Sequence, residues 1–106
     1  MCEGSRTGAK IHFDRIPVVE EVYKYIDMGA IPGGTNRNWD SYGHKVSELS
    51  DLQKSILCDP QTSGGLLIAV IPEYENEFVQ LAKGLGLSLQ SFGSLTESND
   101  STIIVA

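Results

Sequence analysis

The sequence has little sulfur chemistry and no long apolar run. It contains two cysteines, Cys2 and Cys58, and no CxxC pair. Such a count argues against a disulfide framework and supports a zinc site poorly, so we expect two free thiols. The longest strongly apolar run, residues 66–71, is far shorter than the roughly 20 residues that cross a membrane. No apolar segment follows Met1, so no signal peptide is visible. We therefore expect a cytoplasmic protein without a membrane partner.

Basic residues are also scarce. The chain has 8 Lys and Arg against 14 Asp and Glu, a formal net charge of −6, and it has no basic run. The average field repels a phosphodiester backbone, so nucleic acid is not an expected partner. What remains is an ordinary globular mixture, 41% hydrophobic and 21% charged over 106 residues. This length and composition predict one domain over residues 1–106.

Three segments have helical patterns. Pro17 opens a predicted helix, apolar residues recur every three or four positions after it, and Gly29 fits its end. Ser50 and Gln53 fit a capping box, which predicts a helix over residues 51–57. This helix is expected to bury Leu52 and Ile56. Pro72 opens a third helix, whose expected apolar stripe consists of Tyr74, Phe78, Leu81, Ala82 and Leu85.

Four segments are predicted strands: residues 9–13, 66–71, 87–95 and 102–105. The run 66–71 is apolar throughout, which is typical of a central strand buried on both faces. Residues 30–47 show neither periodicity and are predicted to form a long packed loop. The order of elements predicts an α+β fold, a mixed sheet with helices packed on it.

Two segments, residues 32–38 and 59–65, concentrate glycine and polar side chains. Paired glycines let backbone N–H groups approach an anion, and Thr, Ser, Asn and Arg donors suit phosphate. Neither segment fits a Walker A loop or GxGxxG, and tight turns are the simpler use of such glycines. The candidate residues of a phosphate or nucleotide cleft are Gly33, Gly34, Thr35, Asn36, Arg37, Asn38, Thr62, Ser63, Gly64 and Gly65.

Other polar residues make weaker candidates. His44 is a possible general base, with Asp40 as its one evident carboxylate partner. Asp40 and Asp59 fit ligands of a hard cation such as magnesium, but two isolated acids are too few for a site. Asp59 also fits a turn before proline. We expect structural roles for two further residues. His12 is expected on the exposed face of a strand, and Cys58 is expected to be a small buried side chain. We therefore assign no catalytic residue and no metal site to the chain.

Both glycine segments resemble one enzyme family. Residues 57–70 resemble the DPQTSGG signature of the selenophosphate synthetases (selenide, water dikinases). Residues 31–38, with Tyr42-Gly43-His44, are similar to the PGGTxRN…GH segment of the same family, in the same order. The resemblance covers essentially the whole chain but only about the last third of a full family member. It implies the C-terminal α+β domain of the aminoimidazole ribonucleotide synthetase type.

The resemblance also implies a function. The family makes selenophosphate, AMP and phosphate from selenide and ATP with Mg²⁺. Its reactive Cys or selenocysteine, the partner Lys and the metal-binding aspartates lie upstream of the part that this chain resembles. We therefore expect the N-terminal domain of the same protein as partner, no dikinase activity in this chain alone, and no tightly bound cofactor. The two glycine segments would face the cleft between the domains.

Two alternatives remain open. The chain fits a free-standing ligand-binding or interaction module that keeps the fold without catalysis. It also fits a superfamily member in which a carbamoyl, thiamin or purine intermediate replaces selenide, although the resemblance of both glycine segments argues against this.

Overall fold

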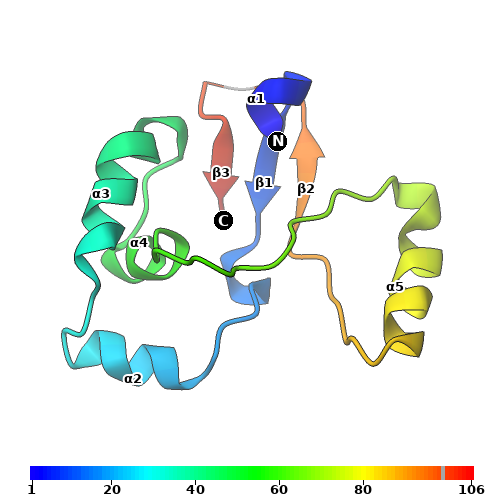
Figure 1. Cartoon of the computed structure of the whole chain (residues 1–106). Coiled ribbons are helices and arrows are strands. Elements are labelled where there is room, and N and C mark those ends of the chain that lie inside the picture. The colour runs from blue at the N-terminus through cyan, green and yellow to red at the C-terminus, as the bar shows by residue number, and fades with distance from the viewer. Residues whose placement is uncertain (99) are drawn as a thin grey trace.

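The computed structural model describes residues 1–98 and 100–106. Its centre is a three-stranded mixed sheet in the order β2–β1–β3 (Figure 1). Strand β1 (Gly8–Ile11) pairs antiparallel with β2 (Gly93–Thr96) and parallel with β3 (Ile103–Val105). The combination of a small mixed sheet with helices confirms the predicted α+β class.

The outer strands are shorter than the sequence pattern predicts. Strand β2 begins only at Gly93, where a Cβ atom would lie 2.5 Å from the carbonyl oxygen of Lys10. A glycine is therefore needed where the two strands approach most closely. The prediction that places His12 within a strand is wrong. Strand β1 ends at Ile11, and the half-buried His12 instead precedes a short 3₁₀ turn while its backbone N–H donates to the carbonyl oxygen of Phe92 at 2.7 Å.

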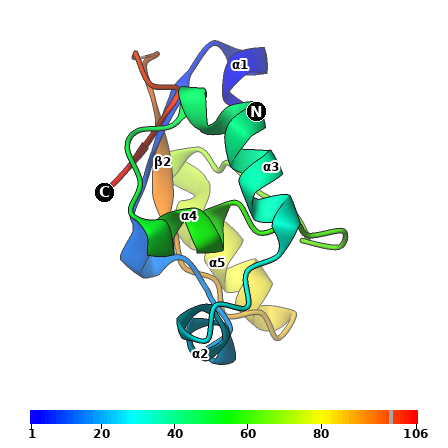
Figure 2. The ribbon, with the colours of Figure 1, turned by 90° about the vertical axis from the view of Figure 1, so that its left-hand side faces the viewer.

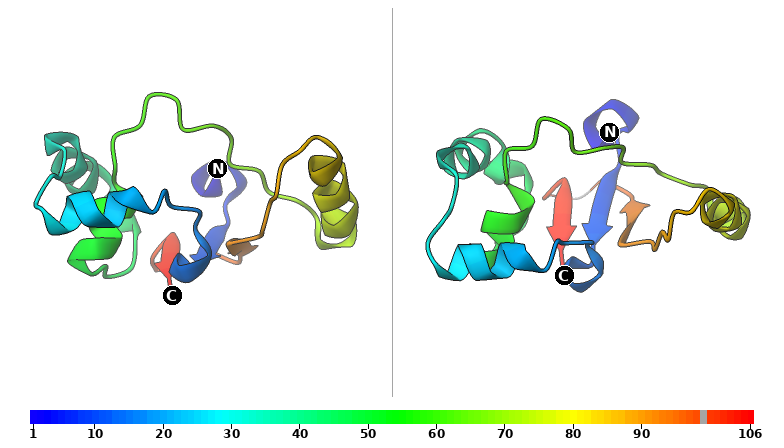
Figure 3. Two further views of the ribbon diagram at one scale, coloured as in Figure 1. Left: turned by 90° about the horizontal axis from the view of Figure 1, so that it is seen from below. Right: turned by 60° about the horizontal axis from the view of Figure 1, so that its bottom comes forward.

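The helices stand beside the sheet rather than across its faces (Figures 1 and 3). Helices α2, α3 and α4 lie on one side, whereas α5 lies on the other. The helical elements, including three short 3₁₀ turns, are α1 (Cys2–Ser5), η1 (Phe13–Arg15), α2 (Glu21–Asp27), α3 (Gly33–Tyr42), η2 (Gly43–Lys45), α4 (Asp51–Leu57), η3 (Pro72–Tyr74) and α5 (Glu75–Gly84).

The predicted helix start at Pro17 is wrong, because α2 begins only at Glu21. The signals at one end of α2 and one end of α4 are nevertheless present. Gly29, with a φ of 76°, follows the end of α2 in the left-handed conformation that glycine tolerates. The capping box of α4 is confirmed in both directions, with Gln53 N–H donating to Ser50 Oγ at 3.2 Å and Ser50 N–H donating to Gln53 Oε1 at 2.9 Å. Burial is only partly as expected, because Ile56 is half-buried but Leu52 is exposed.

The third predicted helix forms, but its apolar stripe has little cover. Pro72 opens η3, and α5 follows directly. Ala82 is 5% exposed, whereas Leu81 and Leu85 on the same stripe are 64% and 73% exposed. The periodicity therefore identified the helix correctly and overestimated what packs against it.

The predicted central strand over residues 66–71 is wrong. This segment has no regular structure, and Leu66 is 89% exposed. A strand exists only where a neighbour accepts and donates its backbone hydrogen bonds. The outer edge of β3 already meets Val46 in a parallel bridge, and the Ser47 N–H donates to the Ile103 carbonyl oxygen at 2.8 Å. The apolar run indicates that these residues favour burial, but it does not indicate that a partner strand is present.

The chain is open for its size. Its accessible surface is 8246 Å², whereas a compact monomer of this mass exposes about 5,800 Å². The radius of gyration is 15.1 Å, against about 13 Å for a compact chain of this length. Among the described residues, no helix is long and apolar enough to cross a membrane. Much of the apolar surface in 66–89 therefore has no cover within this chain.

Candidate functional site

The first glycine segment opens a helix instead of lying in a loop. The predicted long loop over residues 30–47 is wrong, because α3 and η2 occupy most of it. Pro32 is the N-cap residue of α3, and the Thr35 N–H donates to its carbonyl oxygen at 3.0 Å. Gly33 and Gly34 therefore form the first turn, where N–H groups lack partners within the helix and the dipole favours anions.

Helix α3 lacks the apolar periodicity that predicts a helix, because it packs through small residues. Gly34 is buried against Pro60, and Gly43 lies under the ring of Trp39, where a Cβ would be 2.6 Å from ring atom Cδ2. Large apolar side chains at helical spacing are the signal that sequence reasoning uses. Here close backbone approach does the packing, so that signal is missing.

The second glycine segment is irregular and mostly exposed. Residues 59–65 follow α4 directly, and Thr62, Ser63, Gly64 and Gly65 are all exposed. Gly65 has a φ of 81°, which a glycine adopts without strain. The Gln61 side-chain amide donates to Asp59 Oδ2 at 3.4 Å, within the segment itself. The backbone and hydroxyl groups of 62–65 are therefore open to a ligand.

Two contacts join the segments. Asn38 Nδ2 donates to the carbonyl oxygen of Cys58 at 2.9 Å, across 20 positions of sequence. A Cβ on Gly34 would lie 2.7 Å from Pro60 Cγ and 2.8 Å from Pro60 Cβ. Figure 2 shows α3 standing beside α4, whose C-terminal end leads into the second segment. The two motifs therefore meet at the start of the second one.

A hollow of about 490 Å³ lies at this junction. Its polar lining comes from both motifs, with Asn38 from the first and Asp59, Gln61 and Thr62 from the second. The remaining lining residues are apolar or cyclic: Ile16, Ile56, Leu57 and Pro60. The sequence did not identify these four as site residues. Pro60 lies within the second segment, and Ile56 and Leu57 lie just before it, but nothing in the sequence pointed to Ile16.

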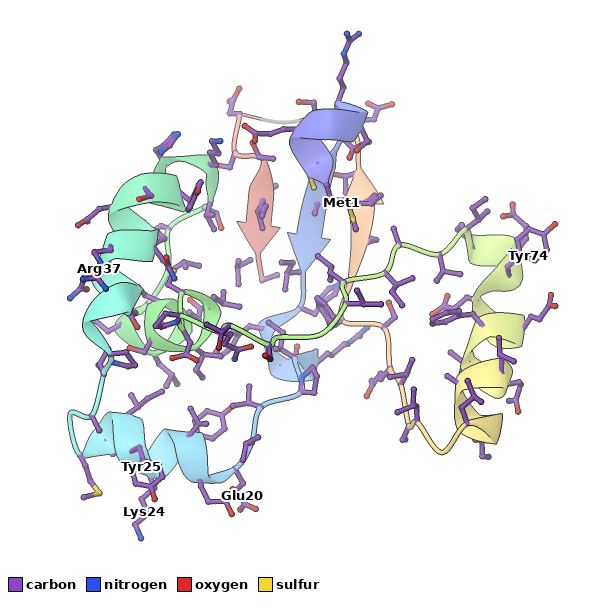
Figure 4. The ribbon with its side chains drawn as sticks, viewed as in Figure 1. Met1, Glu20, Lys24, Tyr25, Arg37 and Tyr74 are labelled. Carbon is purple, nitrogen blue, oxygen red and sulfur yellow. The ribbon has the colours of Figure 1, made fainter. Side chains whose placement is uncertain are left out.

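The candidate residues fall into three groups in the structure. Gly34, Thr35 and Asn38 are buried or already bonded within the chain. Gly33, Asn36 and the residues 62–65 are exposed. Arg37 is exposed as well, but it points outward from α3, on the side away from the sheet (Figure 4). The His44 candidate lies exposed in η2, outside the lining of the hollow.

Thr35 has an unusual environment. It is 2% exposed, and its Oγ1 atom has no hydrogen-bond partner in the described part of the chain. A buried hydroxyl without a partner costs about 1–3 kcal/mol relative to a bonded one. The first turn of α3 thus holds an unused hydrogen-bonding atom.

The ionisable groups around the hollow are few. Burial raises the pKa of the Cys58 thiol, against an opposing effect from the Lys54 charge. Lys54 lies 5.5 Å from the centroid of the Trp39 ring, which fixes one positive charge between α3 and α4. Asp59 is the one carboxylate in the lining. Over residues 1–98 and 100–106, no three His, Cys, Asp or Glu side chains gather into a metal-binding group.

This arrangement has a limited chemical capacity. It offers amide, hydroxyl and backbone N–H donors beside an apolar wall, which suits an oxyanion or a phosphorylated small molecule. Cys58, with a raised pKa, is poorly suited to nucleophilic attack because the thiolate is the reactive form. A single carboxylate does not make a magnesium site.

Known proteins resemble this chain over its whole length. Three curated relatives are named selenide, water dikinase. The protein of Pasteurella multocida is 49% identical over 106 residues, that of Pseudomonas putida 51% over 105, and that of Photorhabdus laumondii 46% over 105. Each match covers 99% of this chain but 30% of the relative, so the chain spans under a third of the relatives' length.

A family model gives the broader assignment. The model described as "AIR synthase related protein, C-terminal domain" matches residues 1–106. The chain belongs to the family of AIR synthase related C-terminal domains.

Proposed function

We propose that this chain is the C-terminal domain of a selenide, water dikinase, an enzyme that makes selenophosphate, AMP and phosphate from selenide and ATP. In this proposal residues 1–106 are one domain of a two-domain cytoplasmic enzyme, and its partner is the N-terminal domain of the same protein. The relatives' names and the two motifs support the reaction assigned to the whole enzyme.

The domain's part in this proposal is to hold phosphate groups. The observation that carries it is the meeting of the two glycine motifs at one hollow, through the Asn38–Cys58 bond and the Gly34–Pro60 contact. Phosphoryl transfer depends on positioning and on donors aimed at the phosphate oxygens. The proposed cleft residues are Gly33, Gly34, Thr35, Asn36, Arg37, Asn38, Thr62, Ser63, Gly64 and Gly65.

The cleft residues differ in what they offer. The N–H groups at the first turn of α3 can donate to an anion, and the positive end of the helix dipole favours its binding there. Thr62 and Ser63 add hydroxyl donors from an exposed segment. Arg37 points outward in this structure and lies outside the lining of the hollow, so it is the least direct of the proposed cleft residues. Asp59 and His44 stay secondary candidates.

The domain alone is proposed to carry out no dikinase reaction. Transfer from ATP needs charges that neutralise the phosphate oxygens, usually with Mg²⁺. ATP and Mg²⁺ are the cofactors of the whole enzyme in this proposal. The single carboxylate of Asp59 provides too few ligands to hold Mg²⁺, so no step through Mg²⁺ is assigned to this chain.

The test compares this chain with a longer protein that carries the same domain. AMP formation that depends on both selenide and ATP is expected from the longer protein only. In the longer protein, Thr62→Ala with Ser63→Ala should lower kcat/KM roughly tenfold, the scale of removing one or two phosphate donors. Ser88→Ala, an exposed serine away from the motifs, is the matched control.

Two results would contradict the proposal. Selenide-dependent AMP formation by the 106-residue chain would place the chemistry within it. A longer protein that binds nucleotide without forming AMP would instead favour a binding module. Calorimetric titration of ATP and Mg²⁺ against the chain should give only weak heat, because few of the required charges are present.

A further inference from the structure

Two of the proposed cleft residues are occupied by contacts inside the chain. Gly34 is buried beneath Pro60, and the donor of the Asn38 amide is used on the Cys58 carbonyl oxygen at 2.9 Å. On the side where they meet the second motif, Gly34 has no space for a ligand, and one N–H of the Asn38 amide is already in use, although Asn38 also lines the hollow. These two contacts are therefore contacts within the chain and not contacts kept open for a ligand.

Both contacts reach the same short stretch. Cys58 and Pro60 bracket Asp59, whose side chain lines the hollow together with Gln61 and Thr62. The Cys58 N–H still donates to the Lys54 carbonyl oxygen at 3.0 Å, but residues 59–62 beyond it have no regular structure and no backbone hydrogen bond to α4. The position of the stretch relative to α3 therefore depends on contacts such as these two.

From this geometry we infer that Gly34 and Asn38 are positioning residues, which fix the Cys58–Thr62 stretch against α3 and act on a phosphate ligand through it. The inference rests on the proposed function for the identity of the ligand, but the positioning itself does not need the ligand. Thr62 and the exposed residues after it make the contact, and Gly34 and Asn38 set where they stand.

The sharpest evidence is the size of Gly34. The three atoms nearest to an added Cβ are Cγ, Cβ and Cδ of Pro60, at 2.7, 2.8 and 3.7 Å. Two of these distances are shorter than real Cβ contacts allow, so Gly34→Ala must displace the ring and the stretch that carries it. Alanine also favours a helix over glycine by about 1 kcal/mol. A functional loss in Gly34→Ala would thus occur although the helix itself is stabilised.

A double-mutant cycle with Pro60→Gly tests the inference, because that change removes all three opposing atoms. In the longer enzyme, Gly34→Ala should raise the KM for ATP roughly tenfold, as expected for an overpacked contact that misplaces a binding segment. In the Pro60→Gly background, the same change should alter KM by less than about twofold. If Gly34 touched the ligand itself, the loss would be equal in both backgrounds, and that result would overturn the inference.

A substitution at Asn38 provides an independent test of the inference. Asn38→Leu has nearly the same shape and removes the donor to the Cys58 carbonyl oxygen without adding a charge, so KM should rise in the same direction. Combined with Gly34→Ala, it should add little, because both changes release the same stretch. Fully additive losses would mean that the two residues act separately. Gly84→Ala, in α5 with open space around its added Cβ, is the glycine control and should leave KM and kcat unchanged.

A measurement without ligand separates this inference from the proposed function. In the 106-residue chain, Gly34→Ala should shift the backbone amide NMR resonances of Gln61 and Thr62, and it should not do so in the Pro60→Gly background. An enzyme without ATP-dependent activity would refute the proposed function, while this NMR cycle would still decide the positioning role. Unchanged resonances in Gly34→Ala would overturn the role whatever the ligand.

Discussion

The Nζ atom of Lys45 lies 2.7 Å from Oε1 of Glu3, so an ion pair ties η2 to α1 across 42 positions of sequence. The hydrogen bond and charge of Lys45 lower the pKa of the Glu3 carboxyl. Because this pKa is lower in the folded chain than in the unfolded one, the stabilisation is present above the unfolded pKa. It is lost as the pH falls through the folded value.

The first prediction concerns this pair. NMR titration of the Glu3 carboxyl should give a pKa below that of a free glutamate, and Lys45→Met should return it toward the ordinary value. The pair is exposed to solvent, so Glu3→Gln should change the melting temperature little. A normal Glu3 pKa in the unmodified chain would show that the pair does not persist in solution.

The capping box of α4 gives a second prediction. Ser50→Ala removes the acceptor for the Gln53 N–H and should lower the free energy of unfolding by about 1 kcal/mol. Urea denaturation followed by circular dichroism measures this. Ser88→Ala, an exposed serine outside the helices, should leave the midpoint unchanged. Equal midpoints for both variants would mean that the cap contributes nothing.

Cys58 gives a third prediction, because burial raises the pKa of its thiol. In a Cys2→Ser background, the rate of iodoacetamide alkylation should rise with pH and reach its half-maximum above the ordinary thiol range. Unfolding in urea should bring the half-maximum back to that range. Rapid alkylation of the folded chain at neutral pH would contradict the burial and reopen a nucleophilic role.

The fourth prediction concerns the exposed apolar segment. Leu67 is 64% exposed, so Leu67→Ser should change the free energy of unfolding by no more than about 0.5 kcal/mol. Binding of a hydrophobic dye should fall in the same variant, because part of the apolar surface is removed. Ala82→Ser places a hydroxyl at a buried position and should cost more stability than Leu67→Ser. The reverse order would mean that residues 66–71 are packed in solution.

Local signals in the sequence carry a good part of this fold. The α4 helix follows its capping box residue for residue, and Gly29 follows the end of α2 at Asp27, because both features depend on neighbours within four positions. The mixed sheet with helices follows from the order of elements. Strand 66–71 fails because pairing depends on a distant neighbour that an apolar pattern does not identify.

The candidate site divides in the same way. The two glycine motifs stand out by composition, and the structure brings them to one hollow. Helix α3 within the first motif is not visible from the sequence, since Gly34 and Gly43 pack by lacking a side chain. The roles of Asn38 and Pro60 are equally hidden, because their contacts exist only once α3 and the end of α4 are side by side.

The central position of β1 has a consequence for how the protein is made. Strand β1 lies near the start of the chain, yet both of its partners come from the last part. On a ribosome, Gly8–Ile11 emerges long before either partner exists, so both of its edges wait unpaired while the intervening helices form. Contacts between such distant parts of a chain make folding slow. Assembly of the sheet is thus expected to follow formation of the intervening helices, because it needs every residue through Val105.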